Sequence, residues 1–338
     1  METLKTTVVG SYPVPEWLKV SPSPAVLQDA MRLVLDVQER AGIDVIGDGE
    51  LARWDLQRRE PAGMVERFVR PMTGVQSGLT RSQREAFLAD PATAYRAKAP
   101  GVVVDELGDG DLDLLREYQQ ARALTSRELK FTLTSPYMLA KVVVDDHYRD
   151  IESLTLAFAD VLAGQLKGID AAVIQIDEPH LPGHPDHSQL AATAINRVLD
   201  AAEDGVSWAV HLCFGNFGGQ MIQQGDYRKL IEFLNLLQCD HVILETTRRS
   251  DSEIESLKDI DDRIGLGLGV IDVKDLQVES ADTVAGRIES LANRLGLERL
   301  QYVHPDCGLQ VLPRPVADGK LRTLVAGRDL FLKKKSSV

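Results

Sequence analysis

Short apolar runs alternate with longer amphipathic stretches along most of this chain. Residues 6–10 have the apolar pattern of a short buried strand, and residues 25–40 carry apolar side chains at helical spacing. Gly42 comes directly after that stretch and is typical of a residue that ends a helix. Residues 43–46 form the next apolar run. The beginning of the chain therefore predicts strand, helix, strand.

The same alternation resumes near residue 130 and continues to residue 304. Further strands are predicted at 130–134, 172–176, 207–211, 241–245, 264–268 and 300–304. Helices are predicted between them at 151–166, 188–202, 227–237, 252–258 and 281–295. Buried strands that alternate with amphipathic helices indicate a parallel sheet, and eight such units favour a closed (β/α)8 TIM barrel. A doubly wound open sheet is the alternative.

The pattern is less regular after the second predicted strand. We expect short strands at 65–69 and 101–104, a polar helix at 81–87, and a helix at 112–124 that leads back into the main fold. The region of about residues 53–128 is therefore predicted to be an insertion over one end of the barrel. Residues 1–338 are expected to form one catalytic domain, because barrels of this class exceed the usual domain length.

Composition and charge remove several classes of function. With 44% hydrophobic and 26% charged residues, the chain resembles a globular protein. Its formal charge of −13 argues against a nucleic-acid partner, and its apolar runs are too short for a membrane helix. The basic run at 333–335 is expected to be a solvated tail. We predict no signal peptide, no membrane partner and a cytoplasmic location.

Polar residues follow the predicted strands at their carboxyl ends, the face at which barrel enzymes place their active sites. These residues are Ser11, Asp48, Glu50, Thr134, Ser135, Asp177, Glu178, His211, Cys213, Glu245, Asp272 and Cys307. His211 and Cys213 are two residues apart at the end of one strand, so their side chains should project from the same face. Helix capping explains single Asp and Ser residues, but it explains a histidine and two cysteines poorly.

Zinc is the metal that such a set of side chains fits. His211, Cys213, Glu245 and Cys307 would offer it nitrogen, sulfur and oxygen ligands at the barrel mouth. A cysteine after a strand is more often a buried apolar residue, however, and Glu245 is as well suited to pair with a nearby arginine. The residues alone leave both interpretations open.

Four motifs resemble the catalytic half of cobalamin-independent methionine synthase. They are Thr7-Val-Val-Gly10-Ser11-Tyr-Pro13, Gln175-Ile-Asp177-Glu178-Pro179, His211-Leu-Cys213-Phe-Gly-Asn216 and His304-Pro-Asp306-Cys307-Gly308-Leu309. They occur in the family's order and span nearly the whole chain. The resemblance implies a (β/α)8 barrel that binds Zn2+ through His211, Cys213, Glu245 and Cys307.

The resemblance also implies the reaction. The expected enzyme is a methyltransferase that activates the homocysteine thiol as a zinc thiolate and methylates it to methionine. Gly10, Ser11, Glu50 and Asp177 are expected to bind the amino acid. Two carboxylates suit its ammonium group, and backbone N–H groups near Gly10 and Ser11 suit its carboxylate. The alternative for Glu50 and Asp177 is a helix-capping or ion-paired carboxylate.

Three departures from the family concern the methyl donor. The 338 residues contain no counterpart of the N-terminal half of the folate-dependent enzymes, and the family's folate-stacking tryptophan is missing near Val142. Lys274 stands where the family has its proton-donating histidine. We therefore expect a non-folate donor such as methylcobalamin or a methylated corrinoid protein. Lys274 is expected to act as an acid or as an electrostatic partner.

Other functions also fit the residues. One is alkylation of a different thiol, such as coenzyme M, by an epoxide at the same zinc site. Another is a metal-free barrel of the uroporphyrinogen decarboxylase type, or a barrel that only binds a ligand. His180, His184 and His187 resemble a metal-binding loop, but the prolines and glycine between them predict an irregular surface loop. Cys239 is expected to be a packing residue.

Overall fold

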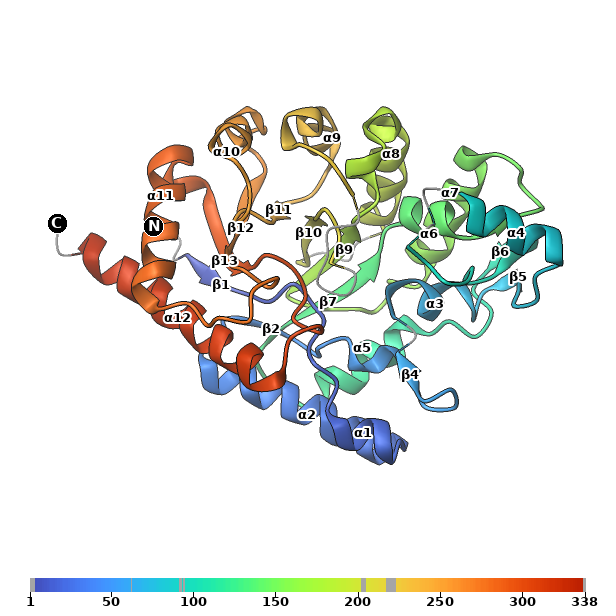
Figure 1. Cartoon of the computed structure of the whole chain (residues 1–338), viewed down its shortest axis with the longest axis horizontal. Coiled ribbons are helices and arrows are strands. Elements are labelled where there is room, and N and C mark those ends of the chain that lie inside the picture. The colour runs from blue at the N-terminus through green and yellow to red at the C-terminus, as the bar shows by residue number, and fades with distance from the viewer. Residues whose placement is uncertain are drawn as a thin grey trace.

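The computed structural model describes residues 4–61, 63–90, 93, 95–201, 205–216 and 223–336. Eight parallel strands surround the centre of the molecule (Figure 1). In order around the barrel they are β1 (Lys5–Thr6), β13 (Leu300–Pro305), β12 (Gly265–Ile271), β11 (His241–Leu244), β10 (Ser207–Leu212), β9 (Val173–Glu178), β7 (Glu128–Thr134) and β2 (Val45–Gly47). A bridge between Thr7 and Val45 joins β1 to β2. The predicted (β/α)8 barrel is confirmed.

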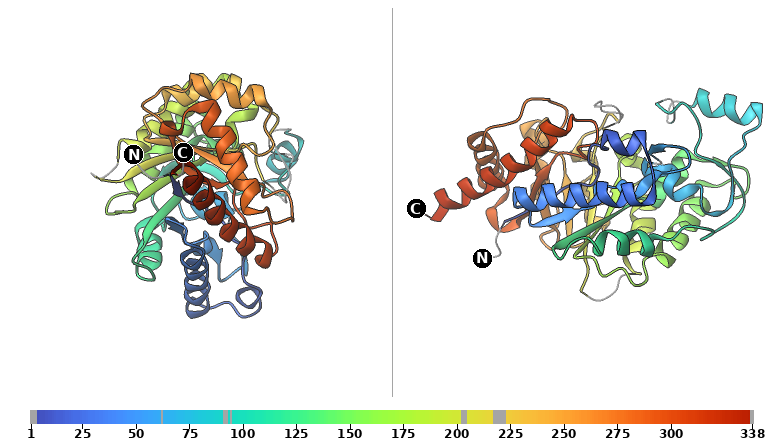
Figure 2. Two further views of the ribbon diagram at one scale, coloured as in Figure 1. Left: turned by 90° about the vertical axis from the view of Figure 1, so that its left-hand side faces the viewer. Right: turned by 90° about the horizontal axis from the view of Figure 1, so that it is seen from below.

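Helices surround the strands (Figures 1 and 2). They are α1 (Glu16–Val20), α2 (Pro24–Ala41), α5 (Leu114–Arg122), α6 (Pro136–Val142), α7 (Ile151–Gly164), α8 (Ser188–Leu199), α9 (Ile231–Leu236), α10 (Asp251–Ser256), α11 (Ala281–Leu295) and α12 (Arg314–Ser336). Helix α2 begins where the Ser23 side chain accepts a hydrogen bond from the Val26 N–H. It ends at Gly42, whose φ of 83° favours glycine.

Gln38 connects α2 to the barrel. Its side-chain amide donates to the Gly47 carbonyl at 2.7 Å and accepts from the Gly47 N–H at 3.0 Å. Because Gly47 is the last residue of β2, this pair of bonds fixes the carboxyl end of that strand. Glu50 follows three residues later. None of the helices described is long and apolar enough to span a membrane.

The insertion that the sequence predicts lies between β2 and β7. It contains β3 (Trp54–Asp55), β4 (Glu60–Pro61), α3 (Gly63–Val69), β5 (Thr73–Gln76), α4 (Arg81–Ala89) and β6 (Val102–Gly108). β3 and β4 pair as a hairpin, while β6 pairs with β5 and with β8 (Val144–Asp145). Figures 1 and 2 show α4, β5 and β6 at the end of the molecule opposite the two termini.

Two local predictions are corrected by the structure. Residues 65–69 belong to helix α3 and not to a strand. Val65, Phe68 and Val69 are its buried residues, and their spacing of three and four is helical, although valine and phenylalanine favour strands. The basic run at 333–335 is exposed as expected, but it forms the last turns of α12 and not a tail. Cations at that end of a helix are favoured by its dipole.

Candidate metal and substrate site

Three of the four predicted metal ligands meet at the carboxyl ends of the strands. His211 is on β10, Cys213 follows it, and Cys307 follows β13. Their ligand atoms all lie within 4.8 Å of one another. Cys307 Sγ is 3.9 Å from His211 Nε2 and 4.0 Å from Cys213 Sγ. His211 and Cys213, which the sequence placed on one face of a strand, are thus joined by a third predicted ligand from a distant part of the chain.

The geometry of this cluster fits zinc. Two sulfurs bound to a tetrahedral zinc ion at its usual bond length would lie about 3.8 Å apart, close to the separation found between Cys213 and Cys307. His211 Nδ1 is 3.0 Å from the Ile243 carbonyl oxygen, which only accepts, so Nδ1 carries the hydrogen. Nε2 is left as the ligand atom that faces the sulfurs. An imidazole and two thiols are a donor set that zinc prefers.

The two thiols have opposite pKa shifts. The hydrogen bond between them lowers the pKa of Cys307 well below its ordinary value, even though burial raises it. The same hydrogen bond, together with burial, raises the pKa of Cys213. Burial lowers the pKa of His211, but the hydrogen bond and charge of Cys307 outweigh this effect and the net shift is upward. Both shifts come from the close approach of the two sulfurs, and they favour the thiolate form, the form that binds metals, at Cys307.

Glu245, the fourth predicted ligand, follows β11 but is outside the group of three. Its buried carboxylate accepts hydrogen bonds from Arg249 Nε at 3.1 Å and from Lys274 Nζ at 3.3 Å. The charge of Glu245 contributes to the raised pKa of Cys213, so the carboxylate and the cluster interact electrostatically. The pairing with an arginine that the alternative interpretation expected is present, although this carboxylate is buried and not solvated.

Lys274 is linked to the metal cluster by its ion pair with Glu245. Burial lowers the pKa of Lys274, but the negative charges of Glu245 and Cys307 outweigh burial and raise it overall. A lysine with a raised pKa keeps its proton at neutral pH. Of the two roles expected for Lys274, this environment favours the electrostatic one.

Glu50 lies directly beside Gly10. A Cβ atom on Gly10 would overlap Glu50 Oε1, so this position of the carboxylate requires glycine at residue 10. The carboxylate pairs with Arg53 at 3.1 Å and accepts a hydrogen bond from the Thr132 hydroxyl at 3.1 Å. Glu50 has a left-handed φ of 59°. Such strained backbone in a residue other than glycine concentrates at functional sites.

Asp177 is buried, whereas the Glu50 side chain is partly exposed. Asp177 lies opposite His211 in the pairing of β9 with β10. Burial raises the pKa of Asp177, an effect that the charges of His211 and Arg53 oppose. Burial also raises the pKa of Glu50 to about 7, while Arg53 lowers it and Asp177 raises it. Each carboxylate makes it harder for the other to ionise. A cation bound between them would relieve that repulsion.

One cavity of about 560 Å3 connects the metal cluster to the two carboxylates. The residues of the predicted site that line it are Ser11, Glu50, Asp177, His211, Cys213 and Cys307. Its opposite wall comes from the insertion and includes Met64, Glu66, Arg70, Tyr95, Arg96 and Lys98. A cavity of this size holds a drug-sized ligand. It therefore has room for an amino acid and part of a second substrate.

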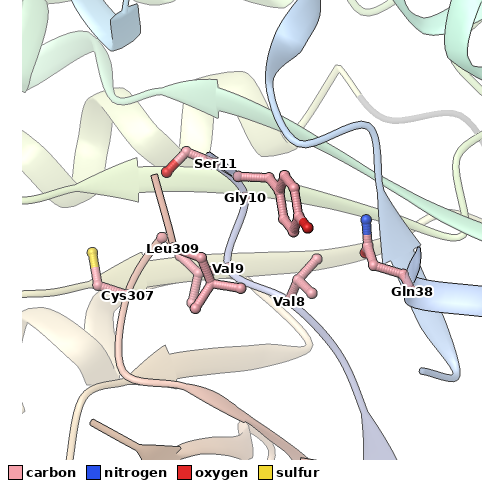
Figure 3. Close-up of a pocket in the computed structure, with 9 residues that line it drawn as sticks. Val8, Val9, Gly10, Ser11, Gln38, Cys307 and Leu309 are labelled. Carbon is pink, nitrogen blue, oxygen red and sulfur yellow. The ribbon is translucent and has the colours of Figure 1, made fainter. Parts of the chain in front are cut away.

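Ser11 joins the carboxylate side to the metal side. It lines a smaller cavity of about 10 Å3 together with Cys307, and Figure 3 shows both side chains. This is roughly the room that one water molecule needs. The Leu309 N–H donates to the Ser11 carbonyl at 2.7 Å, and Gly308 packs against the Ser11 side chain. The loop that carries Gly10 and Ser11 is thus fixed to the loop that carries Cys307.

The residues that hold the two carboxylates were missed at the level of sequence. They are Arg53, Lys130, Thr132 and Gln175, all buried. Gln175 carried a usable signal, because it is two residues before Asp177 on the same strand and so shares its face. Lys130 carried another, since it is a cation in an otherwise apolar strand.

The histidine loop after β9 lies at the surface at Gly183 and Asp186, as predicted, with His184 and His187 half-buried. Its first histidine departs from the prediction. His180 is fully buried, and its Nε2 lies 2.6 Å from the hydroxyl of Tyr95 in the insertion. His187 Nδ1 lies 2.8 Å from the Tyr137 hydroxyl. The prolines and the glycine do make the loop irregular. They carry no information about Tyr95, which comes from a distant segment and contacts His180.

Comparisons with known proteins agree with this fold. The model of the cobalamin-independent synthase catalytic domain matches residues 4–328. The methionine synthase of Thermococcus kodakarensis is 30% identical to this chain, with 99% of the chain and 97% of that protein covered. That of Pyrococcus abyssi is also 30% identical, with 95% and 91% covered.

Among solved structures, a B12-independent methionine synthase from Shewanella sp. W3-18-1 in complex with selenomethionine has the same fold. Its TM-score is 0.82 at 23% identity, with 99% of this chain and 100% of that chain covered. Both the family and this relative are described as independent of cobalamin, so the methylcobalamin or corrinoid-protein donor that the sequence suggested gains no support. From the match over residues 4–328 and its relatives, the chain belongs to the cobalamin-independent methionine synthase family of methyltransferases.

Proposed function

We propose that this protein methylates the thiol of homocysteine to give methionine at a zinc site formed by His211, Cys213, Glu245 and Cys307. The observation that carries the proposal is that one cavity is lined by both the His/Cys/Cys cluster and the carboxylates Glu50 and Asp177. The Shewanella relative supports it, because selenomethionine is the selenium analogue of the product.

Each group has a chemical task in this reaction. Bound zinc would supply the Lewis acidity that ionises the thiol of the substrate near neutral pH. Glu50 and Asp177 accept hydrogen bonds from the substrate ammonium group, and the backbone near Gly10 and Ser11 receives its carboxylate. A carbon–sulfur bond forms, the bond from the methyl group to its donor breaks, and the thiol proton leaves. The insertion forms one wall of the cavity around these groups.

The charges of the site favour homocysteine over coenzyme M. Coenzyme M has a sulfonate and no ammonium group, so Glu50 and Asp177 would repel it. The metal-free alternatives leave the cluster of His211, Cys213 and Cys307 without a task. We therefore place alkylation of coenzyme M second.

The test combines metal analysis with separate donor assays. Purified protein is analysed for zinc, then given homocysteine with methyltetrahydrofolate, homocysteine with methylcobalamin, or coenzyme M with an epoxide. We expect about one zinc ion per chain and methionine from one of the methyl donors. The productive reaction identifies the donor. A zinc-free protein, or one that alkylates only coenzyme M, would contradict the proposal.

A further inference from the structure

A chain of hydrogen bonds runs through the barrel beneath the carboxylate side of the site. Lys130 Nζ donates to Gln175 Oε1 at 2.7 Å and to the Val8 carbonyl at 2.8 Å. Gln175 Nε2 then donates to the Val9 carbonyl at 2.8 Å and to Asp177 Oδ1 at 2.7 Å. Lys130, Gln175 and Asp177 are at most 5% exposed, so water does not compete for these bonds.

Lys130 helps to fix the orientation of the Gln175 amide. Burial lowers the pKa of Lys130 to about 7, an effect that the charge of Asp177 opposes. In its charged form the Lys130 side chain only donates hydrogen bonds, so it faces the amide oxygen. The amide NH2 group is then directed to Val9 and Asp177, and one hydrogen serves each acceptor. If the amide turned over, its oxygen would face the Val9 carbonyl and the Asp177 carboxylate with no hydrogen between them. The Val9 carbonyl and the Asp177 carboxylate favour this orientation as well, and Lys130 supplies the donor that the amide oxygen would otherwise lack.

The same bonds connect the two parts of the amino-acid site. Val8 and Val9 directly precede Gly10 and Ser11, the residues proposed to receive the substrate carboxylate. Asp177 is proposed to receive the substrate ammonium group. Lys130 and Gln175 therefore set the separation between these two groups. Within the described part of the chain no residue donates to Asp177 Oδ2, and Asp177 lines the large cavity, so this oxygen is free for a ligand.

We propose that Lys130 and Gln175 are positioning residues that make the site selective for thiols and thioethers that carry an α-ammonium group. They act by fixing Asp177 relative to the Gly10–Ser11 segment. This proposal rests on the proposed amino-acid substrate and adds the residues that decide its selectivity. A merely structural role would lower stability and leave the selectivity between ligands unchanged.

The test measures binding of two ligands to the zinc-loaded protein by calorimetry, which needs no methyl donor. The ligands are methionine and 4-(methylthio)butanoate, which is methionine without its amino group. We expect wild type to prefer methionine by about 10- to 100-fold, the range for a hydrogen bond to a charged group. In Lys130→Met this ratio should fall toward one, with unchanged zinc content and unchanged affinity for 4-(methylthio)butanoate.

Gln175→Glu provides a second variant that keeps the size and the bond to Lys130. Its carboxylate has no hydrogen for Asp177, so the same loss of selectivity is expected even if Lys130→Met does not fold. His241→Phe is the matched control. His241 is buried in the barrel and stacks on Tyr302 at 4.6 Å, and neither of its ring nitrogens has a hydrogen-bond partner in the described residues. Its selectivity should equal that of wild type.

The outcomes separate this proposal from the proposed function. A folded Gln175→Glu variant that keeps the wild-type ratio overturns the positioning role. An equal loss of selectivity in His241→Phe overturns it as well, because any disturbance of the barrel interior would then have the same effect. A wild-type protein that binds neither methionine nor homocysteine contradicts the amino-acid substrate itself.

Discussion

The two sides of the large cavity hold their functional groups in different ways. On the metal side, His211 donates a hydrogen bond to the Ile243 carbonyl, and the sulfurs of Cys213 and Cys307 make contacts near 4 Å. On the carboxylate side, Glu50 and Asp177 are held by short bonds from buried partners.

This difference follows from what each side binds. Thiols and imidazole obtain their strongest partner from a metal ion, so the protein needs only to bring them together. A buried carboxylate has to be stabilised before any ligand arrives, because an unpaired charge in the interior is costly. Removal of one metal ligand should therefore cause a large loss of zinc binding. Removal of one group on the carboxylate side should cause a smaller loss of substrate binding.

The largest effect is expected from breaking the metal side with Cys307→Ser. We expect zinc affinity to fall by more than roughly 100-fold, beyond the loss typical of changes around a metal ligand, and activity to fall with it. Competition with a chromophoric chelator measures the affinity. Cys239→Ser is the control, because Cys239 is a buried cysteine outside the cluster and should keep zinc and activity. A Cys307→Ser protein that retains both would remove Cys307 from the ligand set.

An intermediate effect is expected from Asp177→Asn. The loss of one charged hydrogen-bond acceptor should raise the KM for homocysteine by about 10- to 100-fold and leave the zinc content unchanged. Steady-state kinetics and metal analysis of the same preparation check this. Loss of zinc from Asp177→Asn would contradict the division of the cavity into a metal side and a carboxylate side, since Asp177 would then belong to the metal side.

The smallest effect is expected from pH. Burial raises the pKa of Glu50 to about 7, and only its charged form attracts an ammonium group, so the affinity for methionine should rise about tenfold from pH 6 to pH 8. Glu50→Gln should remove this rise. The effect of the Glu50 titration on folding stability has the opposite sign. Because the folded state binds this proton more tightly than the unfolded state, the contribution of Glu50 to stability is present below about pH 4.5 and lost by about pH 7.

Calorimetry with methionine at several pH values, on wild type and on Glu50→Gln, measures this dependence. A flat wild-type profile would show that the charge of Glu50 does not contribute to binding. The same rise in both proteins would assign the titration to another group.

The barrel and much of the metal side could be predicted from the sequence because their signals are local. Alternating runs gave the strands, and the two-residue spacing of His211 and Cys213 gave a shared face. The pairing of Lys130 with Gln175 has no such signal. It depends on how β7 and β9 align, with Thr132 beside Gln175 and Lys130 beside Val173, and a single sequence does not report that alignment.

The insertion was the hardest part to predict. Helix α4 and strand β6 agree with their local patterns, whereas α3 was assigned to a strand on the basis of residue type. The contact of Tyr95 with His180, and the place of the insertion on the cavity wall, arise from packing between segments far apart in the chain. Local periodicity carries no information of this kind.

The pairing of β1 with β13 also has a consequence for synthesis on the ribosome. The first strand pairs on its second side only when β13 has been made, and that strand leads directly to Cys307. A nascent chain therefore carries His211 and Cys213 for the time needed to add the 94 residues that separate Cys213 from Cys307. Both the metal cluster and the contact of Ser11 with Gly308 form late, so a chain that stops before β13 lacks the third metal ligand and the contact that fixes the Gly10–Ser11 loop.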